Sequence, residues 1–370
     1  MVCFHGSCDS KHKSFVTGRV TSVPILDNQG GFLPPRMTAI ERLTSRGIMR
    51  RGSPARGFHY KHADGRKVKA ADLERIDLLK IPPAWTNVAI NAAPTGRIQA
   101  VGQDAAGRWQ YLYHENHTRA QQRKKFQRLV AFGESLPRLR ATVARDLKLP
   151  GLPKERVMAA ILRILSMSFI RPGSEIYANE NGSYGIATLR PRHVSVKGDR
   201  INFEFLGKSG QSHSREIRDK LVAATLKELL KNSNRRVFKY IGPDGKFVDV
   251  TRPTINRYIK EVMGQNFSAK DFRTWAGTLV CACALARNGS ANPLNAGGIA
   301  TAIEETATVL GNTPAVSRDS YVCPAVISSF EKGEVLHCYF KTLQQLTSYR
   351  GLKLHRAEKA LLRLLKKSVA

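Results

Sequence analysis

The feature of the sequence with the clearest chemistry is a tyrosine near the C-terminus, Tyr321, which follows Asn312 by nine residues. Both lie in the segment Leu310–Tyr321, which begins where a helix is expected to end. A tyrosine hydroxyl on a short loop, among the arginines of a very basic chain, is a candidate nucleophile for a phosphodiester. An exposed tyrosine also serves in packing, and an asparagine here also caps a turn. The assignment therefore depends on partner groups elsewhere in the chain.

Three basic residues upstream are suited to a phosphodiester. Arg171 follows the apolar stretch 155–170, at a helix C-terminus where the dipole favours a cation with or without a bound acceptor. Lys208 stands between glycines at an expected hairpin tip, where a lysine is ordinarily just solvated. Arg273, just after Lys270, is placed near the start of a helix. The dipole disfavours a cation there unless it shares a bound anion with the helix end.

The charge of the chain indicates the class of partner. Its 370 residues include 60 Lys and Arg against 29 Asp and Glu, a formal net charge of +31, while 42% of the residues are hydrophobic. The hydrophobic content excludes a disordered basic tail and predicts real cores. The surplus of positive charge is typical of polyphosphate binding, whether by a DNA enzyme or by a ribosomal-type protein.

Membrane, metal and disulfide roles are not expected. The sequence has no apolar run of about 18 residues, the length needed to cross a bilayer. Its six cysteines include no CxxC pair, so we expect reduced thiols rather than a metal site or a disulfide framework. The N-terminus shows no charged segment followed by an apolar stretch, which argues against secretion. We expect a cytoplasmic protein.

From about Arg50 the character of the sequence changes and predicts a small β-rich domain after a flexible extension. Residues 1–45 are rich in Ser, Gly and Pro without periodicity, and we assign them to the extension. The domain is expected to span residues 46–125, with one amphipathic helix that presents Leu73, Ile76 and Leu79. Its strand-like runs are Phe58–Tyr60, Asn87–Ile90, Arg97–Val101 and Trp109–Tyr113.

The rest of the chain predicts a larger, mainly helical domain at residues 126–350 and a basic C-terminal helix at 351–370. A polar basic stretch, Arg119–Arg128, leads into it, and Glu155–Ile170 is apolar nearly all round, as in a central buried helix. A β-meander is expected at Gly185–Leu189, Val194–Val196, Ile201–Leu206 and Ser212–Ile217. Further helices are expected at Leu221–Leu230, Thr254–Met263, Arg273–Ala286, Ala300–Leu310, Pro324–Glu331, Tyr339–Leu346 and Leu354–Lys367. The fold class is α+β.

The order and context of these segments resemble the small bacterial and viral type IB DNA topoisomerases. The resemblance runs from about residue 47 to about residue 349. In the larger domain it is carried by Phe169-Ile170-Arg171-Pro172-Gly173, Glu180–Leu189, Phe203–Lys208 with His213, Lys270-Asp271-Phe272-Arg273-Thr274, and Leu310–Pro314 with Ser317 and Tyr321. In the β-rich domain it is carried by Arg51–Phe58, Ile81–Trp85 and Gln110-Tyr111-Leu112-Tyr113, which are similar to the bacterial branch.

The resemblance implies a fold and a reaction: a tyrosine recombinase/topoisomerase IB-like catalytic domain that relaxes supercoiled duplex DNA. Tyr321 would attack the scissile phosphorus and form a 3′-phosphotyrosyl enzyme, so that religation needs neither ATP nor metal. Arg171 and Arg273 would clamp the non-bridging oxygens. Lys208 would protonate the leaving 5′ oxygen. Asn312 stands where many relatives carry histidine, which leaves it a hydrogen-bonding role only.

The resemblance also implies how double-stranded DNA is held: a monomer would close as a clamp around the duplex, in the nucleoid. Gln110, Tyr111 and Tyr113 match groove contacts of the viral relatives, and Tyr177 and Lys270 match further DNA contacts. Ser174 replaces a base-reading lysine of those relatives, which weakens the expected sequence preference.

Two other functions remain as alternatives. A tyrosine recombinase uses similar chemistry, but it usually carries a His-x-x-Arg segment where this chain has Lys270–Arg273, and a helical N-terminal domain. The second alternative is a basic chromatin or RNA-binding protein. In such a protein the ordered set of reactive residues would have arisen by chance.

Overall fold

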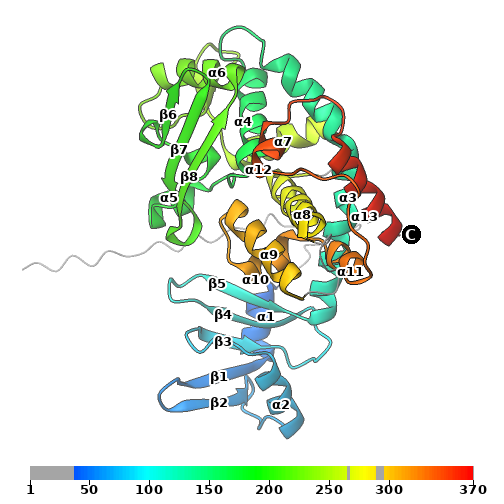
Figure 1. Ribbon diagram of the computed structural model, residues 1–370. Coiled ribbons are helices and arrows are strands. Elements are labelled where there is room, and N and C mark those ends of the chain that lie inside the picture. Colours follow the sequence, from blue (N-terminus) through cyan, green and yellow to red (C-terminus); the bar gives the residue numbers. More distant parts are fainter. Residues whose placement is uncertain (1–36, 265–266, 289–295, 370) are drawn as a thin grey trace, which may run out of the picture. The chain divides into compact units, whose positions relative to one another are not determined.

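The computed structural model describes residues 37–264, 267–288 and 296–369, and the chain divides into two compact units, Met1–Gln121 and Gln122–Ala370 (Figure 1). Most of the predicted extension, residues 1–36 of 1–45, lies outside the described residues. The predicted α+β class is confirmed, because helices and antiparallel sheets both contribute to the fold. Each unit is described by itself.

The first unit is built on a five-stranded antiparallel sheet in the order β2-β1-β3-β4-β5. Side chains of β3 and β4 alternate between its two faces. Val88 and Ile90 pack with Ile76 of helix α2, whereas Ala89 packs with Leu43 of helix α1. The elements are α1 (Ala39–Arg46), β1 (Ile48–Ser53), β2 (Gly57–His62), α2 (Ala70–Leu78), β3 (Thr86–Ile90), β4 (Ile98–Gln103) and β5 (Trp109–Tyr113).

Helix α1 begins inside the stretch that the sequence assigned to the flexible extension. Thr38 and Glu41 form a reciprocal capping box, in which the Glu41 amide donates to Thr38 Oγ1 at 3.2 Å and the Thr38 amide donates to Glu41 Oε2 at 2.7 Å. Such a box satisfies two backbone donors and starts a helix. The ordered unit therefore begins before residue 46, and the T-x-x-E pattern is the signal that marks its start.

The second unit is mainly helical around one large core. Helix α4 is buried nearly all round, as the apolar run predicted, and so is α8 from Asp271 to Ala286. Its helices are α3 (Glu115–Asp146, which starts in the first unit), α4 (Lys154–Ser168), α5 (Glu175–Asn181), α6 (Lys220–Lys231), α7 (Arg252–Met263), α8 (Ala269–Asn288), α9 (Ala296–Leu310), α10 (Pro314–Tyr321), α11 (Pro324–Glu331), α12 (Leu343–Ser348) and α13 (Arg356–Val369). The strands β6 (Val194–Lys197), β7 (Arg200–Leu206) and β8 (Ser212–Arg218) form an antiparallel meander, and β9 (Lys239–Ile241) pairs with β10 (Phe247–Asp249).

Several predicted elements of this unit were wrong in type or extent. Gly185–Leu189 is not a strand, because the Ile186 amide donates to the Arg171 carbonyl at 2.9 Å and the segment folds into a 3-10 turn. The basic stretch Arg119–Arg128, for which the sequence predicted no element, is part of the long helix α3. The helix predicted at Tyr339–Leu346 is shorter and later, α12 at Leu343–Ser348.

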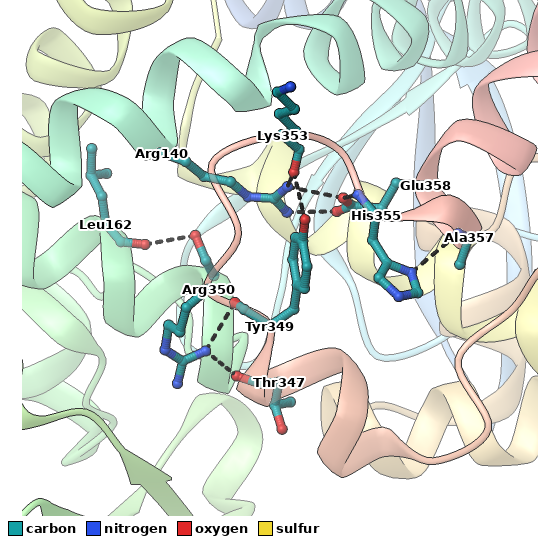
Figure 2. Close-up of polar contacts among 10 residues, drawn as sticks. Arg140, Leu162, Thr347, Tyr349, Arg350, Lys353, His355, Ala357 and Glu358 are labelled. Atoms are coloured by element: carbon teal, nitrogen blue, oxygen red, sulfur yellow. Dashed lines mark hydrogen bonds and ion pairs between the residues drawn. The ribbon is translucent and has the colours of Figure 1, made fainter.

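Helix α13 is the basic C-terminal helix, and it is docked into the core through a polar cluster (Figure 2). Ala357, Ala360 and Leu361 are buried. Glu358 is 3% exposed and accepts two hydrogen bonds from the Arg140 guanidinium of α3, at 2.9 and 2.6 Å. It also accepts from the backbone amide of His355 at 2.8 Å, which caps the start of the helix.

Replacing Glu358 by alanine should destabilise the second unit. Removing one partner of a buried pair leaves the other charge uncompensated, which costs about 3–5 kcal/mol. At about 2–4 °C per kcal/mol for a domain of this size, the melting temperature should fall by roughly 6–20 °C. Calorimetry on the variant checks this. Glu334→Ala, which removes the surface partner of Lys367, is the control and should change the melting temperature far less.

Candidate active site

Helix α8 carries the deepest residue of the candidate site, Arg273, which is 3% exposed. Its guanidinium donates to the carbonyl of Phe169, to the carbonyl of Leu310 at 2.8 Å, and to Asn312 Oδ1 at 3.4 Å. The first two acceptors are backbone atoms at the ends of α4 and α9. Arg273 therefore joins three helices, and its planar group is held in one orientation before any substrate arrives.

The next turn of α8 contacts the backbone of Tyr321 through Gly277 and Thr278. A Cβ added at Gly277 would lie 3.0 Å from Tyr321 Cβ and 3.0 Å from its carbonyl oxygen, so a larger residue there would push the tyrosine backbone away from the helix. Thr278 Oγ1 donates to the Tyr321 carbonyl at 3.1 Å and accepts from the Cys323 amide at 3.1 Å. One helix thus fixes both Arg273 and the backbone of the tyrosine.

Tyr321 is the last residue of helix α10, not a loop residue as the sequence suggested. Thr313 caps this helix by accepting from the Val316 amide at 3.3 Å, and Pro314 occupies its first turn. The tyrosine ring lies 5.0 Å from Cζ of Arg273.

Burial and the neighbouring positive charges shift the pKa of the Tyr321 phenol in opposite directions. Burial alone raises its pKa, but a hydrogen bond from Arg273 and the positive charges of Arg273, Arg171 and Lys208 outweigh burial. The net pKa therefore lies below the usual value for tyrosine. A lowered pKa makes the phenolate, which is the nucleophilic form, more accessible at neutral pH.

Arg171 and Asn312 meet although they are far apart in the sequence. Helix α4 ends at Phe169, whose φ of 55° turns the chain out of the helix. Arg171 follows on this turn, and its Nη2 donates to Asn312 Oδ1. Arg171 and Arg273 both donate to Asn312 Oδ1. The NH₂ group of the Asn312 side chain therefore points away from the two guanidinium groups.

That NH₂ group is a free donor within the site. Asn312 Nδ2 is buried and has no hydrogen-bond partner among the described residues. Its backbone amide is already satisfied by the Ala307 carbonyl at 3.0 Å. A buried donor without an acceptor is costly unless a ligand supplies one. The geometry therefore favours an acceptor oxygen bound beside Asn312 and the two arginines.

Lys208 lies at the tip of the β7–β8 hairpin, as predicted, in a short 3-10 turn that spans Lys208–Gly210. Its side chain is exposed, and its charge acts on Tyr321. The structure thus brings together all five predicted reactive residues, Arg171, Lys208, Arg273, Asn312 and Tyr321.

Two residues that touch this group were not singled out for a role from the sequence. Lys125 of α3 donates to the Ser320 carbonyl at 3.0 Å, at the C-terminal end of α10, and burial lowers its pKa. His213 of β8 packs against Gly311 beside Asn312. The Lys125 contact has no local signal in the sequence, because Lys125 and Ser320 are 195 positions apart.

The predicted DNA contacts lie on surfaces of both units. In the first unit Tyr111 and Tyr113 of β5 are 38% and 46% exposed, and their rings stack with centroids 6.4 Å apart. Gln110 lies half-buried and donates to Asp104 at 2.9 Å. In the second unit Tyr177 of α5 is 47% exposed, and Lys270 is exposed at the start of α8.

The described part of the chain has neither a membrane-spanning helix nor a cluster of metal-ligating side chains. None of the helices in residues 37–264, 267–288 and 296–369 has the length and apolarity to cross a membrane. The same residues include no group of three or more His, Cys, Asp or Glu side chains placed to hold a metal ion.

Comparison with known proteins relates the chain to DNA topoisomerases. Residues 115–334 match the family model of the catalytic core of eukaryotic DNA topoisomerase I, and residues 57–104 match that of the N-terminal domain of bacterial DNA topoisomerase IB. A DNA topoisomerase 1B of Acanthamoeba polyphaga mimivirus is 38% identical over 295 residues, which are 77% of this chain and 88% of the relative. DNA topoisomerase I of monkeypox virus and DNA topoisomerase 1B of vaccinia virus are each 26% identical over 285 residues, 73% of this chain and 85% of the relative.

Proposed function

The chain belongs to the type IB DNA topoisomerases, and from that membership we propose that it relaxes supercoiled duplex DNA by cutting and resealing one strand through a 3′-phosphotyrosyl intermediate, without ATP or metal. The observation that carries the proposal is the convergence of two arginines, a free amide donor and a tyrosine of lowered pKa. Such a set fits a phosphodiester in which negative charge grows on the non-bridging oxygens.

Cleavage is a transesterification on phosphorus. The Tyr321 hydroxyl oxygen attacks, the new bond from this oxygen to phosphorus forms, and the bond from phosphorus to the 5′ oxygen breaks. The phenolic proton leaves to solvent, and Lys208 supplies a proton to the 5′ oxygen as it departs. Religation is the reverse reaction with the 5′-hydroxyl as nucleophile. The energy of the broken bond stays in the tyrosyl ester, so resealing needs no external energy source.

The two arginines and Asn312 stabilise the pentacoordinate transition state. Arg273 is held by carbonyl groups and needs little reorganisation, and Arg171 shares Asn312 Oδ1 with it. This leaves Asn312 Nδ2 free to donate to a non-bridging oxygen. Preorganised donors of this kind contribute more in a buried site than in water.

An Asn312→Ala variant tests the amide donor. Loss of one transition-state donor should slow single-turnover cleavage on the order of 10²-fold. Asn312→His should retain substantial activity, because an imidazole N–H donates similarly. If Asn312 only caps the turn after α9, alanine will lower the melting temperature and leave the cleavage rate of the folded enzyme unchanged. Measuring both quantities on the same variants separates the two roles.

The protein is proposed to act in the nucleoid as a monomer that closes as a clamp around the duplex. Tyr111 and Tyr113 present exposed rings from the first unit, with Gln110 beside them, and Tyr177 and Lys270 present exposed groups from the second. Aromatic and amide side chains of this kind contact bases and sugars, while the surplus of basic residues contacts phosphates.

Binding to duplex DNA should depend steeply on salt. With a net charge of +31, most contacts are expected to go to phosphates, and each contact releases about one counterion. Affinity should fall by about 10³-fold or more between 50 and 200 mM salt. A filter-binding or anisotropy titration measures this. A change of less than about tenfold would contradict a binding surface dominated by phosphate contacts.

Relaxation of a supercoiled plasmid in EDTA and without ATP tests the proposed function. The plasmid carries no recombination site, so a tyrosine recombinase is not expected to relax it steadily. We expect complete relaxation by catalytic amounts of protein. Absence of relaxation by folded protein that binds DNA would reject the proposal.

A further inference from the structure

The imidazole of His213 lies between the hairpin that carries Lys208 and the turn that carries Asn312. His213 is on β8 and is 7% exposed. Its ring stacks on that of Phe205 in the paired strand β7, with centroids 5.2 Å apart and planes 22° apart. The ring is therefore fixed close to the tip of the hairpin, one residue pair from its last pair, Leu206 and Ser212.

Two glycines lie close against this ring. A Cβ at Gly207 would lie 2.4 Å from His213 Cδ2, and a Cβ at Gly311 would lie 2.6 Å from His213 Cε1. Gly207 has φ −96° and ψ −161°, a conformation open to any residue. The ring, not the backbone, explains the glycine at 207. His213 thus fills the space between the residue before Lys208 and the residue before Asn312.

The same strand makes a second tie to this turn. Arg215 Nη2 donates to the Val309 carbonyl at 3.1 Å, at the end of α9. The turn also has internal support, because the amides of Gly311 and Asn312 donate to carbonyls of α9 at 3.2 and 3.0 Å. On the hairpin side, the Tyr184 amide donates to the Leu206 carbonyl at 2.7 Å. Between that point and the tip, the His213 ring connects the hairpin to the turn.

The ring is uncharged at neutral pH. Burial comes first among the causes that lower the pKa of His213 to about 4, followed by the positive charges around it. Those charges come from Arg215 on the same strand, Arg171 after α4 and Arg273 on α8. A neutral ring adds no further repulsion to a site that already holds several cations.

We propose that His213 is a positioning residue that sets where Lys208 stands relative to Asn312 and Tyr321 when a proton is passed to the leaving 5′ oxygen. The inference rests on the proposed function. His213 does not touch the reacting atoms itself. It acts through the hairpin, and its loss should weaken general-acid catalysis while leaving attack by Tyr321 intact.

Single-turnover cleavage by His213→Ala tests the proposal. Misplacement of a catalytic group by about 1 Å can cost 10²-fold, so the rate should fall about 10- to 100-fold. A substrate with sulfur at the 5′ bridging position needs no proton on its leaving group, so most of that loss should disappear on it. In a Lys208→Ala background, the His213 change should have little further effect, because both act on one step. Ser214→Ala, the exposed neighbour on β8, is the matched control.

A merely structural histidine gives a different pattern. The His213→Ala defect would then persist with the sulfur substrate and would add to that of Lys208→Ala, and either result overturns the proposal. Two controls are measured in the same experiment. They are cleavage by the wild-type protein, and the cleavage rate of Lys208→Ala on the substrate with sulfur at the 5′ bridging position. If the wild type forms no covalent adduct, the proposed function fails. If only His213→Ala is not recovered, this inference alone fails.

Adding a methyl group at Gly207 and removing the ring of His213 tests the contact between these two residues directly. Gly207→Ala should slow cleavage, because its Cβ meets the ring. Combining it with His213→Ala removes the clash, so the double variant should cleave no more slowly than His213→Ala alone. A double variant slowed by the product of the two single effects would show that ring and glycine do not interact, and would contradict the proposal.

Discussion

Replacing Tyr321 by phenylalanine should abolish DNA relaxation and the covalent protein–DNA adduct while leaving the fold and DNA binding intact. The change deletes only the nucleophilic oxygen, and no other described tyrosine ring lies over Arg273. The ring still packs with Phe169 and Leu310, and the backbone is still held by Thr278. A hydrogen bond to a charged group contributes about 1.5–3 kcal/mol, so losing the one to Arg273 should leave the variant folded.

Activity, binding and melting temperature of Tyr321→Phe are measured on one preparation. Tyr240→Phe, a half-buried tyrosine of β9, is the control and should relax DNA as the unmodified protein does. An adduct that still forms with Tyr321→Phe and survives detergent would place the nucleophile on another residue.

Replacing Lys208 by alanine should slow cleavage by about 10² to 10⁴, the usual contribution of a general acid. A substrate with sulfur at the 5′ bridging position should recover most of this loss, because a thiolate leaves without a proton. Binding and melting temperature should change little, since Lys208 is exposed at a hairpin tip. Single-turnover cleavage of the two substrates gives the comparison.

Lys246, which follows a glycine in the β9–β10 hairpin, supplies a matched control. Lys246→Ala removes one positive charge from a similar position and should leave the cleavage rate unchanged. A loss with Lys208→Ala that sulfur does not recover would mean that this lysine binds the phosphate instead of donating a proton.

The sequence predicted those elements whose signal is local. The all-apolar run before Arg171 and the alternating runs of the meander correspond to α4 and to β6, β7 and β8. The helix start at Thr38 and that at Thr313-Pro314 were missed, although each has a capping residue that marks it. The start at Thr38 was missed because the surrounding sequence is rich in Ser, Gly and Pro. The start at Thr313-Pro314 was missed because a loop was expected there.

The arrangement of the site depends on contacts that one sequence does not display. Arg171 and Asn312 are 141 positions apart, and Arg273 reaches the carbonyl of Phe169 over 104 positions. Periodicity and spacing place each residue on an element but do not say which elements meet. The resemblance supplied the set of residues. The orientation of Asn312, the seat at Gly277 and the packing of His213 came only from the structure.

Identification of the covalently attached residue is the direct test of Tyr321 as the nucleophile. Cleavage of a 5′-labelled duplex is stopped with detergent, the adduct is digested with trypsin, and the DNA-linked peptide is sequenced by mass spectrometry. We expect a 3′-phosphoryl link to the peptide 319–332, whose one tyrosine is Tyr321. A link through the 5′ end of the broken strand, or attachment to any other residue, would contradict it.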